Sequence, residues 1–83
     1  MANGLHGYRV RYRRRTDWFR VLCDLRAKGF TEARTATVIG VPLTTLRSWK
    51  AGGEPAHTYG HDLLELWIDV TGIPLTGRPM TTG

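Results

Sequence analysis

Residues 31–53 read TEARTATVIGVPLTTLRSWKAGG, and this stretch decides the fold. It contains two short helical patterns that meet at Ile39-Gly40-Val41, and the second pattern ends in Gly52-Gly53. A glycine at such a junction can take the positive φ that a sharp bend needs. Pro42 supplies a φ that suits the first turn of the next helix. A connection this short makes the two helices cross steeply, so the second helix can enter a groove.

Hydrophobic periodicity and capping residues extend this pattern to four helices, at about 17–28, 32–39, 43–51 and 58–71. Thr16 and Thr31 are expected to cap the first two helices. The side chains that point inward are expected to be Trp18, Val21, Leu22, Leu25, Ala33, Ala36, Ile39, Leu46 and Trp49. The fold class is therefore all-α: a small four-helix domain of residues 16–73, with a basic segment before it and a flexible tail at 74–83.

The basic segment comprises residues 1–15. It contains five arginines and no acid: Arg9, Arg11, Arg13, Arg14 and Arg15. Within it, residues 8–13 alternate apolar and basic side chains with the period of a strand. The sequence leaves open whether they form a short strand or a mobile arm. Residues 16–53 carry six basic and three acidic side chains, and residues 54–83 carry one arginine and four acids. A polyanion is therefore expected to meet the first half of the chain.

At the stretch 31–53 the sequence resembles the helix-turn-helix DNA-binding proteins of the Cro/CI, or XRE-like, type of phage and bacterial repressors. The resemblance rests on Ala36, Ile39, Gly40, Val41, Leu46 and Trp49, and it covers about two thirds of the chain. It implies a central helix-turn-helix whose second helix recognises DNA.

The outward side of that second helix carries the candidate recognition residues. Leu46 and Trp49 define the inward direction, which leaves Thr44, Arg47 and Ser48 outward and Thr45 and Lys50 on the flanks. We expect Thr44, Thr45, Arg47 and Ser48 to contact bases, since an arginine can donate two hydrogen bonds to guanine. We expect the DNA backbone to be contacted by Arg9, Arg11, Arg13, Arg14, Arg15, Thr31, Arg34 and Lys50.

The fourth helix has an apolar arc of about 200°, whereas packing on one core needs about 100°. The excess predicts a partner surface, and residues 58–72 are expected to pair two copies as a homodimer. A dimer of this kind binds two half-sites about one helical turn apart.

Other kinds of site are not expected. His57 and His61 are four residues apart, but the sequence offers no obvious third metal ligand, and neither a metal nor a cofactor is predicted. The single Cys23 fits a reducing cytosol. Neither a membrane span nor a small-molecule substrate is indicated, and no enzyme motif is present.

The expected function is sequence-specific binding of double-stranded DNA in the bacterial cytosol or nucleoid, as a small phage- or prophage-type transcriptional regulator that occludes an operator. Three alternatives stay open. The chain could be a small terminase-like accessory protein of DNA packaging or recombination. It could bind RNA through its arginine-rich segment. It could also be an adaptor that docks another protein on its fourth helix.

Overall fold

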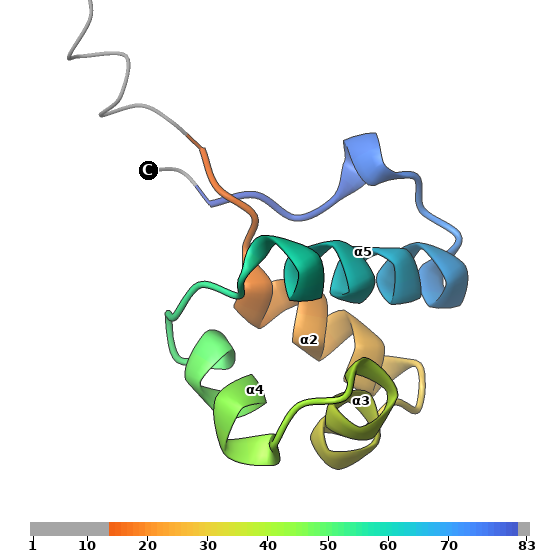
Figure 1. Cartoon of the computed structure of the whole chain (residues 1–83). Helices are drawn as coiled ribbons and strands as arrows, with labels where there is room; N and C mark the ends of the chain where they lie inside the picture. The colour runs from red at the N-terminus through yellow and green to blue at the C-terminus, as the bar shows by residue number, and fades with distance from the viewer. Residues whose placement is uncertain (1–13, 82–83) are drawn as a thin grey trace, which may run out of the picture.

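Four α-helices make up most of residues 14–81, which are the residues that the computed structural model describes (Figure 1). The elements are α2 (Trp18–Ala27), α3 (Glu32–Ile39), α4 (Leu43–Lys50), α5 (His57–Thr71) and a short 3₁₀ helix, η1 (Leu75–Gly77). The expected all-α class is confirmed, and the four helices lie close to the residues predicted for them. Residues 8–13, for which the sequence leaves open a short strand or an arm, lie outside the described residues, together with Arg9, Arg11 and Arg13.

Side-chain caps fix where α2 and α3 begin. Asp17, and not Thr16 as expected, caps α2: its Oδ1 accepts a hydrogen bond from the backbone N–H of Arg20 at 3.1 Å. Thr16 lies one residue too early, and its backbone pairs with another segment of the chain. Thr31 caps α3 as expected, since its Oγ1 accepts from the N–H of Arg34 at 3.1 Å. Both caps satisfy an amide that the first helical turn leaves unpaired.

Gly40 makes the corner between α3 and α4. Its φ is 88°, and its N–H and that of Val41 both donate to the carbonyl of Ala36, at 2.8 and 3.0 Å. A Cβ at residue 40 would meet no atom within 4 Å, so the backbone conformation rather than lack of space favours glycine here. Pro42 precedes α4 in an extended conformation, and its carbonyl accepts the first helical hydrogen bond, from Leu46. Two short helices therefore pack against each other across a three-residue connection.

The hydrophobic core lies where all four helices meet. Its buried members are Trp18, Val21, Leu22, Leu25, Ala36, Leu46, Trp49, Leu63 and Trp67. On α3 one expectation is wrong: Ala33 is exposed, and Thr35 is buried in its place. The inward stripe of α3 runs through Thr35, Ala36 and the half-buried Ile39, so Ala33 lies outside it.

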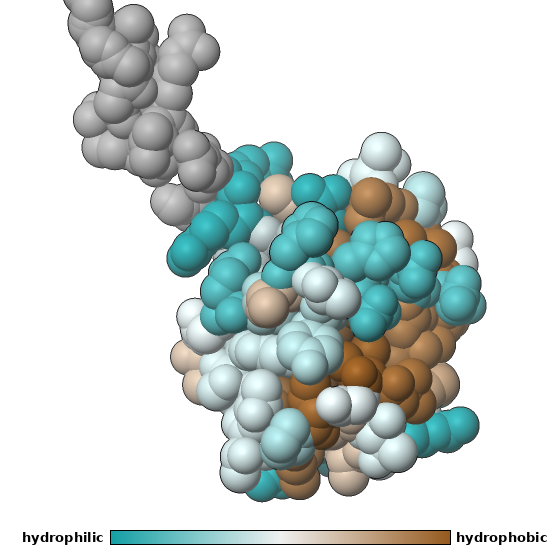
Figure 2. All heavy atoms as spheres, viewed as in Figure 1, coloured by the Kyte–Doolittle hydropathy of each residue, from teal (hydrophilic) through white to brown (hydrophobic). Residues whose placement is uncertain are grey.

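α5 packs across α2, and its first turn approaches closely. A Cβ at Gly60 would lie 3.2 Å from the ring of Trp18, so a small residue at position 60 lets the two helices meet. The apolar side chains Leu64, Leu66, Ile68 and Val70 are only half-buried, and Figure 2 shows apolar surface beside the hydrophilic band that covers α5. None of the helices within residues 14–81 combines the length and apolar character needed to cross a membrane.

The segment after α5 returns along the body to the start of the described chain (Figure 1). Thr16 and Met80 form an antiparallel bridge, the N–H of Asp17 donates to the carbonyl of Pro79 at 2.9 Å, and the N–H of Thr81 donates to that of Arg15 at 2.6 Å. The sequence predicts a flexible tail from residue 74, but residues 75–81 have defined partners. Residues 79–81 pair with the backbone of 15–17, a contact between distant segments that the composition of the tail does not reveal.

Candidate nucleic-acid interface

The outer face of α4 carries the polar side chains that the sequence predicts for it. Leu46 is fully buried and Trp49 is 6% exposed, and they hold α4 on the body. On the opposite side Thr44, Arg47 and Ser48 are exposed. The flanking Thr45 and Lys50 are half-buried. The structure thus brings all five residues together on one helix of eight residues.

A carboxylate that the sequence analysis did not select links this face to α3. Glu32 Oε1 lies 3.3 Å from Arg47 Nε, and Glu32 Oε2 lies 2.5 Å from Lys50 Nζ. The hydrogen bonds from Lys50 and then from Arg47 lower the pKa of Glu32 below its ordinary value of 4.5. These three residues form the Glu32–Arg47–Lys50 cluster. Glu32 is the one acid in residues 31–53, which is the signal that could have drawn attention to it.

Hydroxyl groups on α3 and α4 are partly engaged within the protein. Ser48 Oγ donates to the carbonyl of Thr45 at 2.6 Å, so its proton is directed back to its own helix and its lone pairs face outward. Thr31 Oγ1 is the acceptor of the α3 cap. Ser48 can therefore only accept further hydrogen bonds while it keeps this partner, whereas the O–H of Thr31 can still donate one.

Arg34 is exposed on the first turn of α3, and its guanidinium lies 4.4 Å from the centre of the Phe30 ring. Stacking on an aromatic face leaves the N–H donors at the edge of the guanidinium available. This position is compatible with contact to a phosphate at the start of α3. Glu32 in the same turn opposes such a contact, because the two negative charges repel each other.

Arg15, the last residue of the basic segment, lies beside the end of α4. Arg15 and Lys50 both line a shallow hollow of about 110 Å³, together with Gly52 and Gly53. Arg14 and Arg15 are exposed. Arg15 therefore lies next to the C-terminal end of the helix whose outer face is polar.

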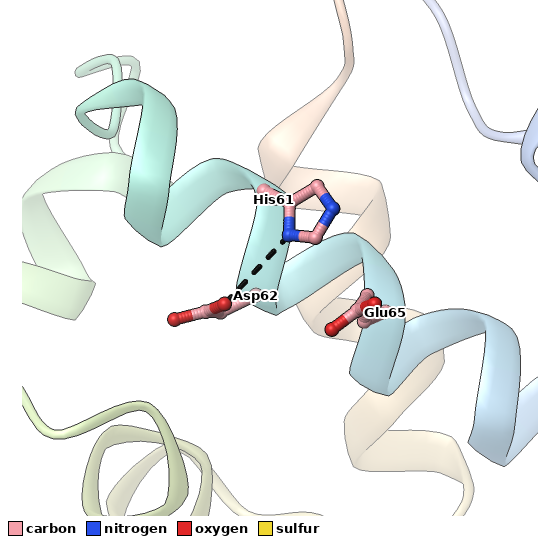
Figure 3. A group of neighbouring side chains, drawn as sticks. All are labelled: His61, Asp62 and Glu65. Carbon is pink, nitrogen blue, oxygen red and sulfur yellow. Dashed lines mark ion pairs between the residues drawn. The ribbon is translucent and has the colours of Figure 1, made fainter.

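A different group of polar side chains lies on α5. Figure 3 shows that His61, Asp62 and Glu65 project from neighbouring turns, and His61 Nδ1 lies 3.8 Å from Asp62 Oδ1. One ligand atom from each of the three falls within 4.8 Å of the others, a separation that a metal ion could bridge. His57, which stands four residues before His61 in the sequence, is not a member of this group. Because all three groups are exposed to solvent, they have the character of a hydrated polar surface.

α5 and the returning tail enclose a groove of about 540 Å³. Its floor includes the apolar side chains of Leu64, Ile68 and Leu75, and Glu54 and Arg78 lie at its edge.

Comparisons of the chain with protein families, with curated proteins and with solved structures gave no match. Any function is thus inferred from the residues of the chain itself.

Proposed function

We propose that the chain binds double-stranded DNA sequence-specifically, with α3 and α4 as a helix-turn-helix and α4 in the major groove. The observation that carries this proposal is the division of α4 into two faces. Leu46 and Trp49 are buried, while Thr44, Arg47 and Ser48 are exposed on the opposite side. A short helix that is held by its inner face and polar on its outer face suits a groove about 12 Å wide.

Base recognition is assigned mainly to Arg47. Its guanidinium can donate two parallel hydrogen bonds to O6 and N7 of guanine, a pairing that discriminates against other bases by about 1–3 kcal/mol. The side chain is 62% exposed, so most of it is available to a ligand. Thr44 and Ser48 supply smaller contacts through a methyl group and through hydroxyl oxygens. Thr45 is half-buried and contributes from the flank.

The DNA backbone is assigned to basic side chains around this helix. Arg15 lies beside Lys50, Arg14 directly before it is exposed, and Arg34 is exposed at the start of α3. Contacts of this kind fix the register of the protein on the duplex without reading sequence. In this account the protein is a small transcriptional regulator of phage or prophage type that blocks an operator by occupying it.

Dimerisation is assigned to the apolar side of α5. Leu64 and Ile68 remain half-buried in one copy, and a second copy would cover them. Two α4 helices related by a two-fold axis would then read a pseudo-palindrome with half-sites about 34–36 Å apart. Sedimentation equilibrium of the full chain is expected to show a dimer that Ile68→Lys converts to a monomer. A wild-type chain that is monomeric at every concentration would contradict this part of the proposal.

Selection of duplexes from a random pool with the purified full chain tests the proposal. The expected result is an enriched symmetric motif that contains guanine in each half. Arg47→Ala should reduce the preference for that motif. Arg26→Ala is the control and should not reduce it, because Arg26 is also exposed but lies on α2, outside the proposed helix-turn-helix. A pool that shows no enrichment with wild-type protein would refute sequence-specific binding.

A further inference from the structure

The carboxylate of Glu32 contacts two cations of α4 at once. Its Oε1 accepts from Arg47 Nε at 3.3 Å, and its Oε2 accepts from Lys50 Nζ at 2.5 Å. The carboxylate belongs to the first turn of α3, so it orients a side chain of α4 from a different helix. The Glu32 side chain is 15% exposed and that of Arg47 is 62% exposed. The acid is thus largely enclosed, while the arginine that it touches reaches into solvent.

The atoms used in this contact leave Arg47 able to read a base. A guanidinium has five N–H donors in a plane, and the hydrogen bond to Glu32 uses the one on Nε. The two terminal nitrogens can still donate in parallel, as contact with O6 and N7 of guanine requires. A long arginine side chain loses conformational freedom when it binds. Part of this conformational freedom is already lost in the free protein, because the hydrogen bond to Glu32 limits the orientations of Arg47.

The charge of Glu32 acts on DNA binding in the opposite sense to that of its partners. A carboxylate beside a helix that faces DNA repels phosphates, and it weakens binding to every sequence alike. Specificity is the difference between the affinities for two ligands, so this uniform repulsion does not change it, and only an effect that is larger in the wrong complex does. An arginine that is already paired with an acid also gains less binding free energy from a phosphate contact. Because phosphates are present in DNA of every sequence, this reduces non-specific binding.

We propose that Glu32 is a specificity-determining positioning residue, which holds Arg47 for guanine and disfavours its use as a phosphate contact. This inference rests on the proposed function. Lys50 completes the arrangement, because it holds the second oxygen of the carboxylate. The ammonium of Lys50 lies 5.7 Å from the centre of the Phe19 ring, so it is itself placed against the body of the protein.

Fluorescence anisotropy with the full chain tests the inference. Each protein is titrated on the selected duplex and on a scrambled duplex of the same composition, at one salt concentration. The quantity compared between proteins is the Kd for the scrambled duplex divided by the Kd for the selected duplex. The proteins are wild type, Glu32→Gln, Arg47→Ala and the double variant. Glu65→Gln is the matched control, since Glu65 is an exposed carboxylate of α5.

Glu32→Gln is expected to bind the scrambled duplex more tightly and to lower the ratio by roughly fivefold, the lower end of what one arginine–guanine pair supplies. In the Arg47→Ala background the same change should leave the ratio unaltered, and Glu65→Gln should leave it at the wild-type value. Glu32→Asp keeps the charge but shortens the side chain, so it should lower the ratio without tightening binding to the scrambled duplex. Circular dichroism checks that each variant is helical.

A wild-type ratio in both Glu32→Gln and Glu32→Asp would overturn the positioning role while sequence-specific binding stood. An equal effect of Glu32→Gln with and without Arg47 would also overturn it, since Glu32 would then act through another group. A wild-type protein that does not distinguish the two duplexes would overturn the proposed function and this inference together.

Discussion

The indole Nε1 of Trp67 donates a hydrogen bond to Oδ2 of Asp24 at 3.0 Å, and this bond joins α5 to α2 across 43 residues of sequence. Trp67 is 1% exposed, so its N–H has little access to water. Loss of the acceptor would leave a buried donor unpaired, which destabilises a protein by about 1–3 kcal/mol. The same bond is one of the contacts that hold α5 against α2.

Asp24→Ala is therefore expected to lower the free energy of unfolding by about 1–3 kcal/mol, as measured by urea denaturation. Arg20→Ala is the control, because Arg20 also contacts Asp24, at 3.3 Å, but its side chain is 66% exposed. An exposed pair of this kind contributes at most about 1 kcal/mol. Equal destabilisation by the two variants would show that the Trp67 bond has no special weight.

The positive φ of Gly40, at the corner between α3 and α4, leads to a second prediction about stability. A φ of 88° disfavours any residue with a Cβ, and Gly40→Ala should destabilise the fold by about 1–2 kcal/mol. Asparagine tolerates the left-handed region better than alanine does, so Gly40→Asn should be clearly less destabilising than Gly40→Ala. Thermal unfolding of the two variants measures the difference. If alanine were tolerated as well as asparagine, backbone strain would not be what favours glycine at the corner.

The Glu32–Arg47–Lys50 cluster predicts a dependence of stability on pH. Because the folded-state pKa of Glu32 is lowered, its ionised form stabilises the fold above the ordinary pKa of 4.5. This contribution is lost as the pH falls through the folded-state value. Wild type should exceed Glu32→Gln in unfolding free energy by on the order of 0.5–1 kcal/mol at neutral pH. The difference should shrink in acid and in high salt, and a difference that grew below pH 4.5 would contradict the ion pairing.

The arginines that enter the domain beside α4 predict a change in the salt dependence of DNA binding. Each phosphate that a protein neutralises contributes about −0.9 to the slope of log affinity against log salt. Replacing both Arg14 and Arg15 with alanine should make the slope shallower by up to about 1.8 and leave the ratio of selected to scrambled affinity unchanged. Arg26→Ala on α2 is the control. An unaltered slope in the double variant would remove these two residues from the interface.

Local signals in the sequence were sufficient for the helices and for the corner. Thr31 stands directly before a helical pattern, and its hydroxyl caps α3 as such a residue does. Gly40 stands between two patterns, and it has the positive φ expected of it. Leu46 and Trp49 repeat at the spacing of a helix face, and both are buried. Each of these inferences depends on residues within a few positions of one another.

Contacts between residues that are distant in the sequence could not be predicted from such local signals. Glu32 meets Arg47 across 15 residues, and Thr16 bridges Met80 near the other end of the chain. Partners of this kind are fixed by how the helices pack, and no spacing in the sequence specifies them.

Methylation of guanine N7 is the measurement that tests the central claim most directly, because N7 lies in the major groove where α4 is proposed to bind. Wild-type protein on its selected duplex is predicted to protect at least one guanine N7 in each half-site from dimethyl sulfate. Arg47→Ala is predicted to lose that protection even at concentrations that saturate the duplex, whereas Arg26→Ala retains it. Equal protection by wild type and Arg47→Ala, or no protected guanine with wild type, would contradict the account.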